Sequence, residues 1–529
     1  ATFSSIMSKV TTQIMPHVYR CRVQSGLGIS PSSASSHSQI MKNLSTLLKQ
    51  ILLADDGQDG DGDDDGSGDW GTTGERKVGH ASVLHVLRCV SYTILLCGED
   101  MQRAYAKAAV HLLLQEEGDE DGAAGLPLLL GGAEKERGAG GSPSLSGMSG
   151  LPEDFRCLLA GAVLNPLKSL EAIQESVEDV LHAMLEGIIT SGRLALAGEM
   201  SASLAGLVNK VDRAQLDAVV MPLVTEVLWS HLASCEEEGG LVIGLTAQAW
   251  IARALAMKKY AKVDQLLDGM LSLLCEGSQG EERSASLCAR LGEAFAVTIS
   301  TEQDRVTDMW HWKAKLLWRQ KLFTSLCTKV LAELRRGREG RHGPAVVLGL
   351  HQVFSPLITS VHFSILRPYA RDIVANLVHS IPLFLALLRE GKDGDGHDGL
   401  GFSKQASSLV GKPLCTNLAL LKQALGEEEM KKAVQDHVKE AVEGLTGALV
   451  SEAAMAGGAG GEAESLRLKR SALECLALLK NLPHYAIHPY FHFVRRKLQT
   501  CLDDATREVR LQAGRTLRAW TAEANTFVS

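Results

Sequence analysis

Three histidines near the C-terminal end of the sequence have a spacing that could hold a metal ion. His484, His488 and His492 stand four residues apart, so on one continuous helix their rings would lie along a single face. Neutral imidazole is a common zinc ligand. Pro489 interrupts that face, however, and no acidic or cysteine ligand lies nearby. The pattern therefore does not favour a metal site at these histidines.

An acid-rich stretch is a second candidate for metal chemistry. Asp61, Asp63, Asp65 and Gly66 reproduce the first half of a calcium-binding EF-hand loop. Thr72 stands where that loop needs its bidentate glutamate, and no strong helix follows at once. Low-complexity sequence is a better account of this stretch than a calcium site.

The glycine motifs lack the context that nucleotide binding requires. Gly394, Gly396 and Gly399 match GxGxxG, but they follow an expected helix rather than a strand. The Gly-Lys pair at 411–412 is followed by proline, so it does not end a P-loop. The sequence also has no HExxH, no CxxC pair and no GxSxG. We therefore expect no catalytic residue, no metal, no cofactor and no enzyme activity.

The residues that must position these side chains form a helical pattern between Leu473 and Trp520. Apolar residues recur there at steps of three and four, which is the period of a helix and not the alternation of a strand. The two faces consist of Phe491, Val494, Leu498 and Cys501, followed by Val509, Ala513, Leu517 and Trp520. Burying each large apolar side chain stabilises by roughly 1.5 to 3 kcal/mol. A single helical hairpin cannot shelter such faces, so this unit needs neighbours.

Four residues in this stretch have the types expected at repeat junctions. Pro489 has no N–H to donate and suits the first turn of a helix. Asp503 and Asp504 stand where a side-chain oxygen can cap the next helix. For Arg510 we favour a structural role, in which it bonds an aspartate in the adjacent repeat turn.

The neighbouring repeats are visible upstream. The stretch from Ser360 to Val378 repeats the order of an apolar residue, a short step, Pro-Tyr and a helix, with Pro368-Tyr369 matching Pro489-Tyr490. The two prolines are 121 residues apart. That separation fits about three units of the ~40-residue period of HEAT-type helix pairs. The sequence therefore predicts an all-α fold, a HEAT/armadillo-type α-solenoid of stacked antiparallel helix pairs.

Composition agrees with this fold and excludes several classes of protein. The 529 residues are 45% hydrophobic but only 5% aromatic, which favours helix pairs over sheets. A net charge of −8 disfavours direct nucleic-acid binding, which depends on basic contacts to phosphates. We find no uninterrupted run of eighteen apolar residues and expect no membrane span. The eleven cysteines, among them Cys89, Cys275 and Cys475, suit buried thiols in a reducing compartment better than disulfides.

The solenoid is expected to be interrupted by disordered insertions rich in Gly, Asp or Ser, because such segments bury too little apolar area to fold. We expect helical repeats at 1–54, a disordered acidic insertion at 55–79, a helical repeat at 80–115 and a disordered Gly-rich insertion at 116–150. HEAT-type repeats follow at 151–390, then a loop insertion at 391–402, a helical repeat at 403–455, a loop at 456–464 and the C-terminal repeat and cap at 465–529. Since the chain starts at Ala1 in mid-pattern, we expect a fragment whose targeting signals are not represented.

Four ordered landmarks in the sequence resemble one known family. They are LAGLVNK (Leu204 to Lys210), LTAQAWIARALAMKKY (Leu245 to Tyr260), LLWRQKLFTSL (Leu316 to Leu326), and the C-terminal unit from Leu482-Pro483 through Leu502-Asp503-Asp504 to Val509-Arg510. Together they resemble the C-terminal HEAT repeats of the methyl-methanesulfonate-sensitivity protein nineteen family. The resemblance runs from about Leu194 to Trp520, and Ser82 to Tyr92 is compatible with it.

The resemblance implies a non-catalytic scaffold of the cytosolic iron-sulfur assembly targeting complex. Members of that family bind a cluster-carrying α/β subunit and a WD-repeat subunit, and bring them to iron-sulfur enzymes of DNA replication and repair. The implied location is cytoplasmic and nuclear, with no direct contact to nucleic acid or membrane. The sequence departs from the family pattern in lacking its N-terminal half and in its long Gly- and Asp-rich loops.

Four arginines are candidates for the docking surface implied by the resemblance. Arg495, Arg496, Arg507 and Arg518 lie beside an aromatic-rich hairpin, and they either contact the assembly partner or are simply solvated. Two other classes of protein remain open. A HEAT adaptor for transport or a phosphatase should lack the Trp318-Arg319-Gln320 and Asp503-Asp504 landmarks together. A repair or transcription factor acting directly on DNA should have a basic concave face.

Overall fold

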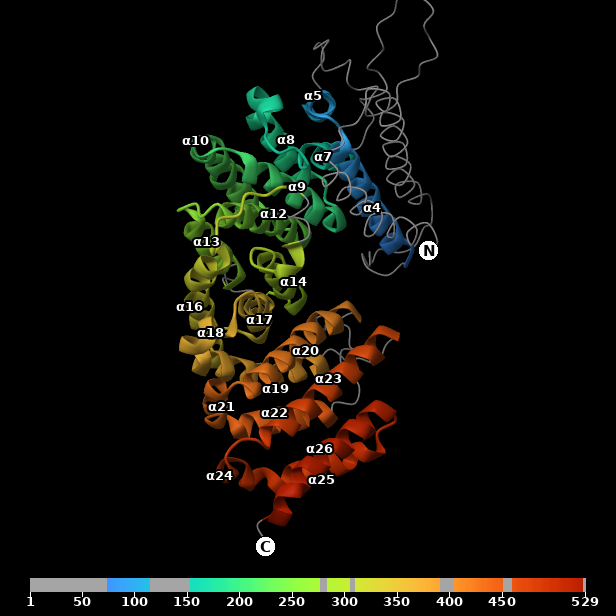
Figure 1. Ribbon diagram of the computed structural model, residues 1–529, viewed down its shortest axis with the longest axis vertical. Helices are drawn as coiled ribbons and strands as arrows, with labels where there is room; N and C mark the ends of the chain where they lie inside the picture. The colour runs from blue at the N-terminus through green and yellow to red at the C-terminus, as the bar shows by residue number, and fades with distance from the viewer. Residues whose placement is uncertain are drawn as a thin grey trace, which may run out of the picture. The chain divides into compact units, whose positions relative to one another are not determined.

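The computed structural model describes residues 74–114, 153–275, 283–304, 310–390, 404–450 and 459–526 (Figure 1). These residues form helices joined by short turns, and no β-strand occurs among them. The predicted all-α fold is confirmed. The predicted repeats at 1–54 and the insertions at 116–150 and 391–402 lie outside the described residues.

Two predicted boundaries are wrong by a few residues. The helix α4 (Gly74–Leu96) begins inside the stretch 55–79 that we expected to be disordered, and α23 (Ala459–Leu479) begins inside the expected loop 456–464. Glycines near these starts suggested loops. The neighbouring Glu, Arg, Lys and Ala residues have high helix propensity, and a helix tolerates glycine in its first turn.

The chain divides into two compact units. Unit 1 contains residues 1–263 and 302–318, and unit 2 contains residues 264–301 and 319–529. The main helices of unit 1 are α4, α5 (Glu99–Leu114), α7 (Glu153–Leu164), α8 (Val177–Thr190), α9 (Leu194–Lys210) and α12 (Glu238–Met257). Within this unit α7 packs on α9 and α9 packs along α12, while α5 and α8 cover the same core.

A proline changes the helical geometry between α9 and α12. This stretch comprises α10 (Arg213–Gln215), η5 (Leu216–Val220), η6 (Leu223–Leu228) and α11 (Trp229–Ser234). Pro222 cannot donate the usual backbone hydrogen bond. On either side of it, Met221 N–H donates to the Leu216 carbonyl and Trp229 N–H to the Val224 carbonyl, each five residues back. This is π-helical geometry, which widens the helix around the proline.

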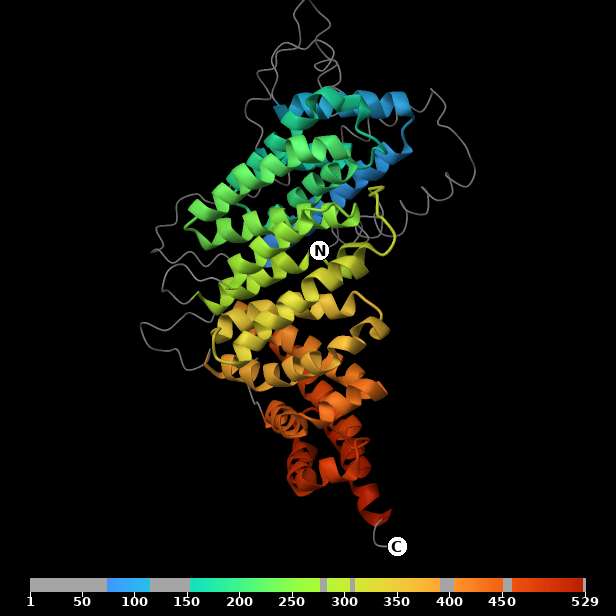
Figure 2. The ribbon, with the colours of Figure 1, turned by 90° about the vertical axis from the view of Figure 1, so that its left-hand side faces the viewer.

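The helices of unit 2 form two layers, and within each layer every helix packs on the next one of that layer along the chain (Figure 2). One layer contains α14 (Ala285–Ala296), α17 (Pro344–Thr359), α20 (Lys404–Gly426), α23 and α26 (Arg507–Thr526). The other contains α19 (Ala370–Glu390), α22 (Val438–Val450) and α25 (Phe491–Thr500), joined by short helices such as α21 (Glu428–Gln435). The helices α13 (Val263–Cys275) and α16 (Trp318–Arg338) lie at the start of the unit.

The predicted sequence echo corresponds to a repeated structure. Arg367–Tyr369 and His488–Tyr490 each form a 3-10 turn. Each turn follows a four-residue helix, α18 (Phe363–Leu366) or α24 (His484–Ile487), and leads into a longer one. Both prolines therefore occupy the first turn of a new helical segment, as predicted for Pro489.

Two glycines allow α14 and α17 to cross closely in unit 2. A Cβ on Gly292 of α14 would lie 2.2 Å from the carbonyl oxygen of Gly349, and one on Gly349 of α17 would lie 2.4 Å from the carbonyl oxygen of Cys288. Backbone atoms cannot move aside as the end of a flexible side chain can. Glycine at both positions is therefore what lets α14 and α17 pack this closely.

Three helical stretches are long and apolar enough to cross a membrane by length and composition: Arg213–Ser234, Glu238–Met257 and Phe363–Arg389. We had expected no such stretch, because the sequence has no uninterrupted run of eighteen apolar residues. A window can still have a high mean hydropathy when it contains a few polar residues. In the structure 83% of the apolar window in Glu238–Met257 and 67% of that in Phe363–Arg389 are buried by protein. A helix buried on all sides is apolar on all sides, which accounts for the composition of these two.

The thiols largely follow the prediction. None of the ten described cysteines forms a disulfide, and seven of them are buried, including Cys89 and Cys475. Burial raises the pKa of Cys475 to about 12 and that of Cys89 to about 11. Cys275 differs, because it is only half-buried.

Candidate functional site

The C-terminal hairpin packs through the faces predicted from the sequence. Val494, Leu498 and Cys501 are buried, as are Val509, Ala513 and Trp520 on α26, while Phe491 and Leu517 are half-buried. The indole N–H of Trp520 donates to the carbonyl of Leu476 on α23, with 2.8 Å between the nitrogen and the oxygen. This bond orients α26 on the preceding repeat.

An ion pair holds the turn between α25 and α26. Lys469 on α23 donates to the Asp504 carboxylate at 2.7 Å, and the backbone N–H of Thr506 donates to the same side chain at 2.8 Å. Burial by itself raises the pKa of Asp504, but these two hydrogen bonds hold it below its ordinary value. Asp504 thus fixes the turn that starts α26.

The other junction residues differ from one another. Arg510 donates to the backbone carbonyls of Asp504 at 2.6 Å and Ala505 at 2.8 Å, so it stabilises this turn through the backbone and not through a carboxylate. Asp503 lies exposed in the 3-10 turn η10 (Cys501–Asp503), and its side chain makes no hydrogen bond to another described residue. The predicted capping role is therefore wrong for Asp503, which comes one residue too early to reach the start of α26.

The four candidate docking arginines all lie on the surface. Arg495 and Arg496 are exposed on α25, and Arg507 and Arg518 on α26. None of the four forms an ion pair with another side chain in the described part of the chain. Large apolar side chains in the same C-terminal stretch are also exposed, with 76% of Tyr485, 43% of Phe493 and 53% of Leu511 accessible. Arg507, Leu511 and Arg518 share one helical face, because they are four and seven residues apart.

The three histidines do not converge as metal ligands. The His484 and His488 rings are 4.9 Å apart between centroids, and the His492 ring meets Phe491 edge-on at 5.7 Å. Among the described residues, the side chains close enough to share an ion are Cys275, Glu333 and His342. The sequence did not single out this group.

Unit 1 contains an irregular segment, residues 310–317, within the range 151–390 for which we predicted HEAT-type helical repeats. The Asn209 side chain pairs with the backbone of Lys313, accepting from its N–H at 2.5 Å and donating to its carbonyl at 3.2 Å. The backbone N–H of Lys315 donates to the Met257 carbonyl at 2.8 Å. His311 and Leu317 have φ values of 53° and 59°, so packing holds the segment in a conformation that such residues rarely adopt.

Two lysines near this segment, the buried Lys210 and the half-buried Lys258, donate to carbonyls at helix ends. Lys210 donates to the carbonyl of Asn165, just after α7, and Lys258 donates to the carbonyl of Val211, just after α9. Carbonyls at helix C-termini lack partners within their own helix, so each lysine satisfies a buried acceptor. Desolvation, reinforced by the nearby charge of Lys313, lowers the pKa of Lys210 to about 7 and that of Lys258 to about 8.

Aromatic rings and a buried arginine complete this cluster. Trp250 and Trp312 meet edge to face with ring centroids 6.2 Å apart. The fully buried Arg253 donates to Asp304 at 2.7 Å, and its guanidinium lies 5.5 Å from the centre of the Trp318 ring. Asn209, Lys210, Trp250, Lys258 and Trp318 all belong to the sequence landmarks, so these landmarks identify a packing arrangement and not a reactive centre.

The comparisons with known proteins agree with these landmarks. Residues 149–480 match the MMS19 C-terminal family, described as "RNAPII transcription regulator C-terminal". The chain is 23% identical over 341 residues to the MMS19 nucleotide excision repair protein homolog of Xenopus laevis, covering 64% of this chain and 28% of that protein.

The homolog from Arabidopsis thaliana is 22% identical over 287 residues, covering 54% of this chain and 22% of that protein. The chain thus spans about a quarter of the length of the curated relatives it matches. Because the family match extends over more than half of the chain, and the landmarks within it pack as one structural cluster, this chain belongs to the MMS19 family through its C-terminal region.

Proposed function

We propose that the chain acts as a non-catalytic helical scaffold in cytosolic iron-sulfur protein assembly, delivering clusters to apoproteins of DNA replication and repair. The observation that carries the proposal is membership of the MMS19 family across residues 149–480. The assembly role itself comes from the resemblance of the sequence landmarks to that family. We further propose that the protein works in the cytoplasm and the nucleus, which imaging of the tagged protein would test.

The chemistry of the described side chains supports a non-catalytic role. Burial raises the pKa of Cys157 and of Cys475 to about 12, so these thiols are poor nucleophiles at neutral pH. The cations of the buried Lys210 and Arg253 and of the half-buried Lys258 are hydrogen-bonded to carbonyls or a carboxylate of the fold. These cations therefore have partners within the fold, and this supports a structural role for them.

The charge of the C-terminal hairpin supports docking of an acidic partner. Between His484 and Trp520 there are seven Lys and Arg residues against three Asp and Glu residues, whereas the whole chain carries a net charge of −8. Arginine beside exposed aromatic and aliphatic side chains is typical of the central residues of protein interfaces. We propose that Arg495, Arg496, Arg507 and Arg518 contact the cluster-carrying α/β subunit, and that the WD-repeat subunit joins the same complex.

Co-purification tests this proposal. The full chain should capture the purified cluster-carrying subunit, and Arg495→Glu with Arg496→Glu should reduce capture at least tenfold. Lys432→Glu with Lys439→Glu is the matched control, since it makes the same charge change at exposed positions of unit 2. No capture by the folded chain would reject the scaffold role, and undiminished capture by the arginine variant would reject this docking surface.

The names of the matched family and of its relatives favour one alternative, a regulator of repair or transcription that acts through other contacts. Direct DNA binding is the version that separates most cleanly from the scaffold role. Direct phosphate contacts predict affinity for duplex DNA that falls steeply with salt. We expect no such binding at physiological salt, and a steep salt dependence in a duplex titration would favour the alternative.

A further inference from the structure

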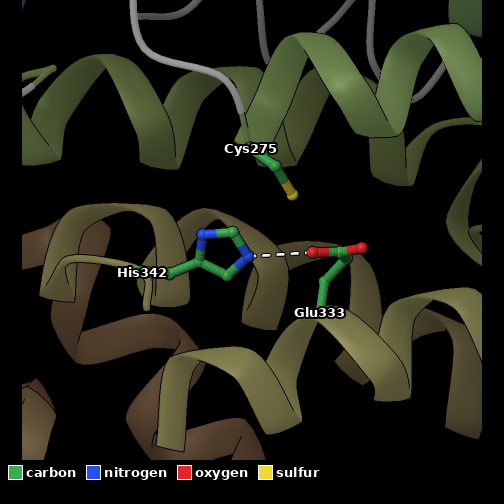
Figure 3. A group of neighbouring side chains, drawn as sticks. All are labelled: Cys275, Glu333 and His342. Carbon is green, nitrogen blue, oxygen red and sulfur yellow. Dashed lines mark hydrogen bonds and ion pairs between the residues drawn. The ribbon is translucent and has the colours of Figure 1, made fainter. Parts of the chain in front are cut away.

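Three side chains of different chemistry converge in unit 2. Cys275 is the last residue of α13, Glu333 lies on α16, and His342 lies in the turn between α16 and α17. Their thiol, carboxylate and imidazole atoms lie within 4.8 Å of one another, and all three residues are half-buried. The sulfur of Cys275 and the ring of His342 both face the Glu333 carboxylate (Figure 3).

The convergence follows from the way α13 and α16 pair. Ser325 donates to Asp264 and Lys329 donates to Asp268, so the two helices run side by side in the same direction with a constant offset along the chain. Glu333 is the next residue on this face of α16, four residues after Lys329. It therefore lies near the C-terminal end of α13, where Cys275 is found.

A glycine turn brings the histidine to the same place. Gly340 has a φ of 75°, its N–H donates to the Gly337 carbonyl at 3.0 Å, and the N–H of Arg341 donates to the Arg336 carbonyl at 2.9 Å. This pair of bonds is the Schellman arrangement that ends a helix at a left-handed glycine. The chain then reverses, and Nε2 of His342 lies 2.8 Å from the Glu333 carboxylate.

We propose that Cys275, Glu333 and His342 bind a single Zn²⁺ ion, with water as the fourth ligand. Thiolate, imidazole and carboxylate are the three protein ligand types that zinc takes, and its bonds to them of about 2.0 to 2.3 Å place tetrahedral donors roughly 3.3 to 3.6 Å apart. The ligand atoms need only small movements to reach these separations. The Cys275 sulfur would move towards the other two ligands, and the His342 ring and the Glu333 carboxylate, now 2.8 Å apart, would separate slightly. The site is independent of the proposed scaffold function.

A neighbouring arginine would orient the carboxylate. Arg336 donates to both oxygens of Glu333, at 2.7 and 3.0 Å. With zinc bound, one oxygen stays with Arg336 while the other, which now faces His342, turns to the metal. Such outer hydrogen bonds commonly fix a metal ligand in place. The ion would cross-link the end of α13 to the α16–α17 turn.

Zinc titration of the metal-stripped full chain against a chromophoric chelator tests the proposal. We expect one ion per chain, and at least tenfold weaker binding in Cys275→Ser, in His342→Gln and in Glu333→Gln. Cys415→Ser and His437→Gln are matched controls, because both residues are half-buried in unit 2 and neither belongs to the cluster, so both should bind zinc as the parent does.

Cobalt substitution gives a second readout, which tests the site in the parent chain before any variant is compared. Co²⁺ bound to the parent chain should show the sulfur-to-cobalt charge-transfer absorption, retained in Cys415→Ser and lost in Cys275→Ser. Absence of this absorption in the parent chain overturns the proposal, as does less than one zinc ion per chain. Zinc binding that survives Cys275→Ser and His342→Gln but is lost in His488→Gln would also overturn it, by assigning the metal to the C-terminal histidines.

Discussion

The cluster around residues 310–317 and the C-terminal hairpin use the same residue types in opposite ways. In unit 1, Lys210 and Arg253 are buried and hydrogen-bonded to a carbonyl and a carboxylate of the fold, and Arg253 lies against the Trp318 ring. In the hairpin, Arg495 and Arg496 are exposed beside aromatic side chains and form no ion pair with the described residues. A stretch rich in basic and aromatic residues can therefore form either a buried structural cluster or an accessible surface, and the burial of its side chains distinguishes the two.

This difference has an energetic basis. Moving a charged side chain out of water is costly unless the protein supplies partners. The helix-end carbonyls of Asn165 and Val211 supply them for Lys210 and Lys258, which therefore contribute to the fold. Exposed arginines remain solvated, and single surface ion pairs contribute only about 0 to 1 kcal/mol. Changes in the cluster should alter stability, and changes in the hairpin arginines should alter binding.

The largest effect is expected at Asn209. The variant Asn209→Ala leaves the part-buried N–H and carbonyl of Lys313 without their amide partner, and leaving such a group unpaired costs up to about 1 to 3 kcal/mol. We expect the free energy of unfolding of unit 1 to fall by about 2 to 5 kcal/mol in a urea titration. The control Asn481→Ala, at an exposed position, should change it by less than about 0.5 kcal/mol. Equally small effects of both variants would contradict the structural role of Asn209 in holding residues 310–317.

The next effect is a pH dependence carried by Lys210. Its pKa is lowered from 10.5 to about 7 in the folded protein, so between these values the unfolded chain binds more protons and this lysine makes stability rise with pH. Lys210→Met removes that contribution. The variant's stability relative to the parent should therefore be highest near pH 7 and fall steadily towards pH 10.5. Urea titrations across this range measure it, and the exposed Lys107→Met should show a constant difference.

A smaller effect is expected at the turn of the hairpin. Lys469 and Asp504 are only 17% and 13% exposed, so Lys469→Met leaves a largely buried carboxylate without its cation. Hydrogen bonds to charged groups contribute about 1.5 to 3 kcal/mol, and we expect a loss within this range in the unfolding free energy of unit 2. Lys480→Met, which removes a half-buried lysine outside any described ion pair, should cost less than about 0.5 kcal/mol. A similar cost for both would remove the special role of Asp504.

The sequence predicted the parts of the fold that depend on local periodicity. The buried faces through Val494 and Val509, and the turns at Pro368 and Pro489, follow from spacing and from the missing proline N–H. The segment 310–317 was not predicted, because its backbone bonds to Asn209, 104 residues away from Lys313 in the chain. A local hydropathy pattern cannot show that a distant amide replaces the hydrogen bonds of a helix.

The candidate sites were predictable only in part for the same reason. Exposure of Arg496 and Arg507 follows from their positions opposite the apolar faces of α25 and α26. Lys469 as the partner of Asp504 was missed, since the two come from different repeats. The convergence of Cys275 with His342 likewise requires the parallel pairing of α13 and α16, which no sequence spacing expresses.

The smallest effect on stability is expected where the effect on binding is largest. Arg495→Glu with Arg496→Glu changes two exposed side chains that form no described ion pair, so the free energy of unfolding should change by less than about 0.5 kcal/mol per site. The same protein should lose capture of the acidic partner, and the parent's capture should weaken with added salt because exposed charges are screened. A loss of several kcal/mol in stability would mean that these arginines support the fold as Lys210 does, and the contrast between the two regions would then fail.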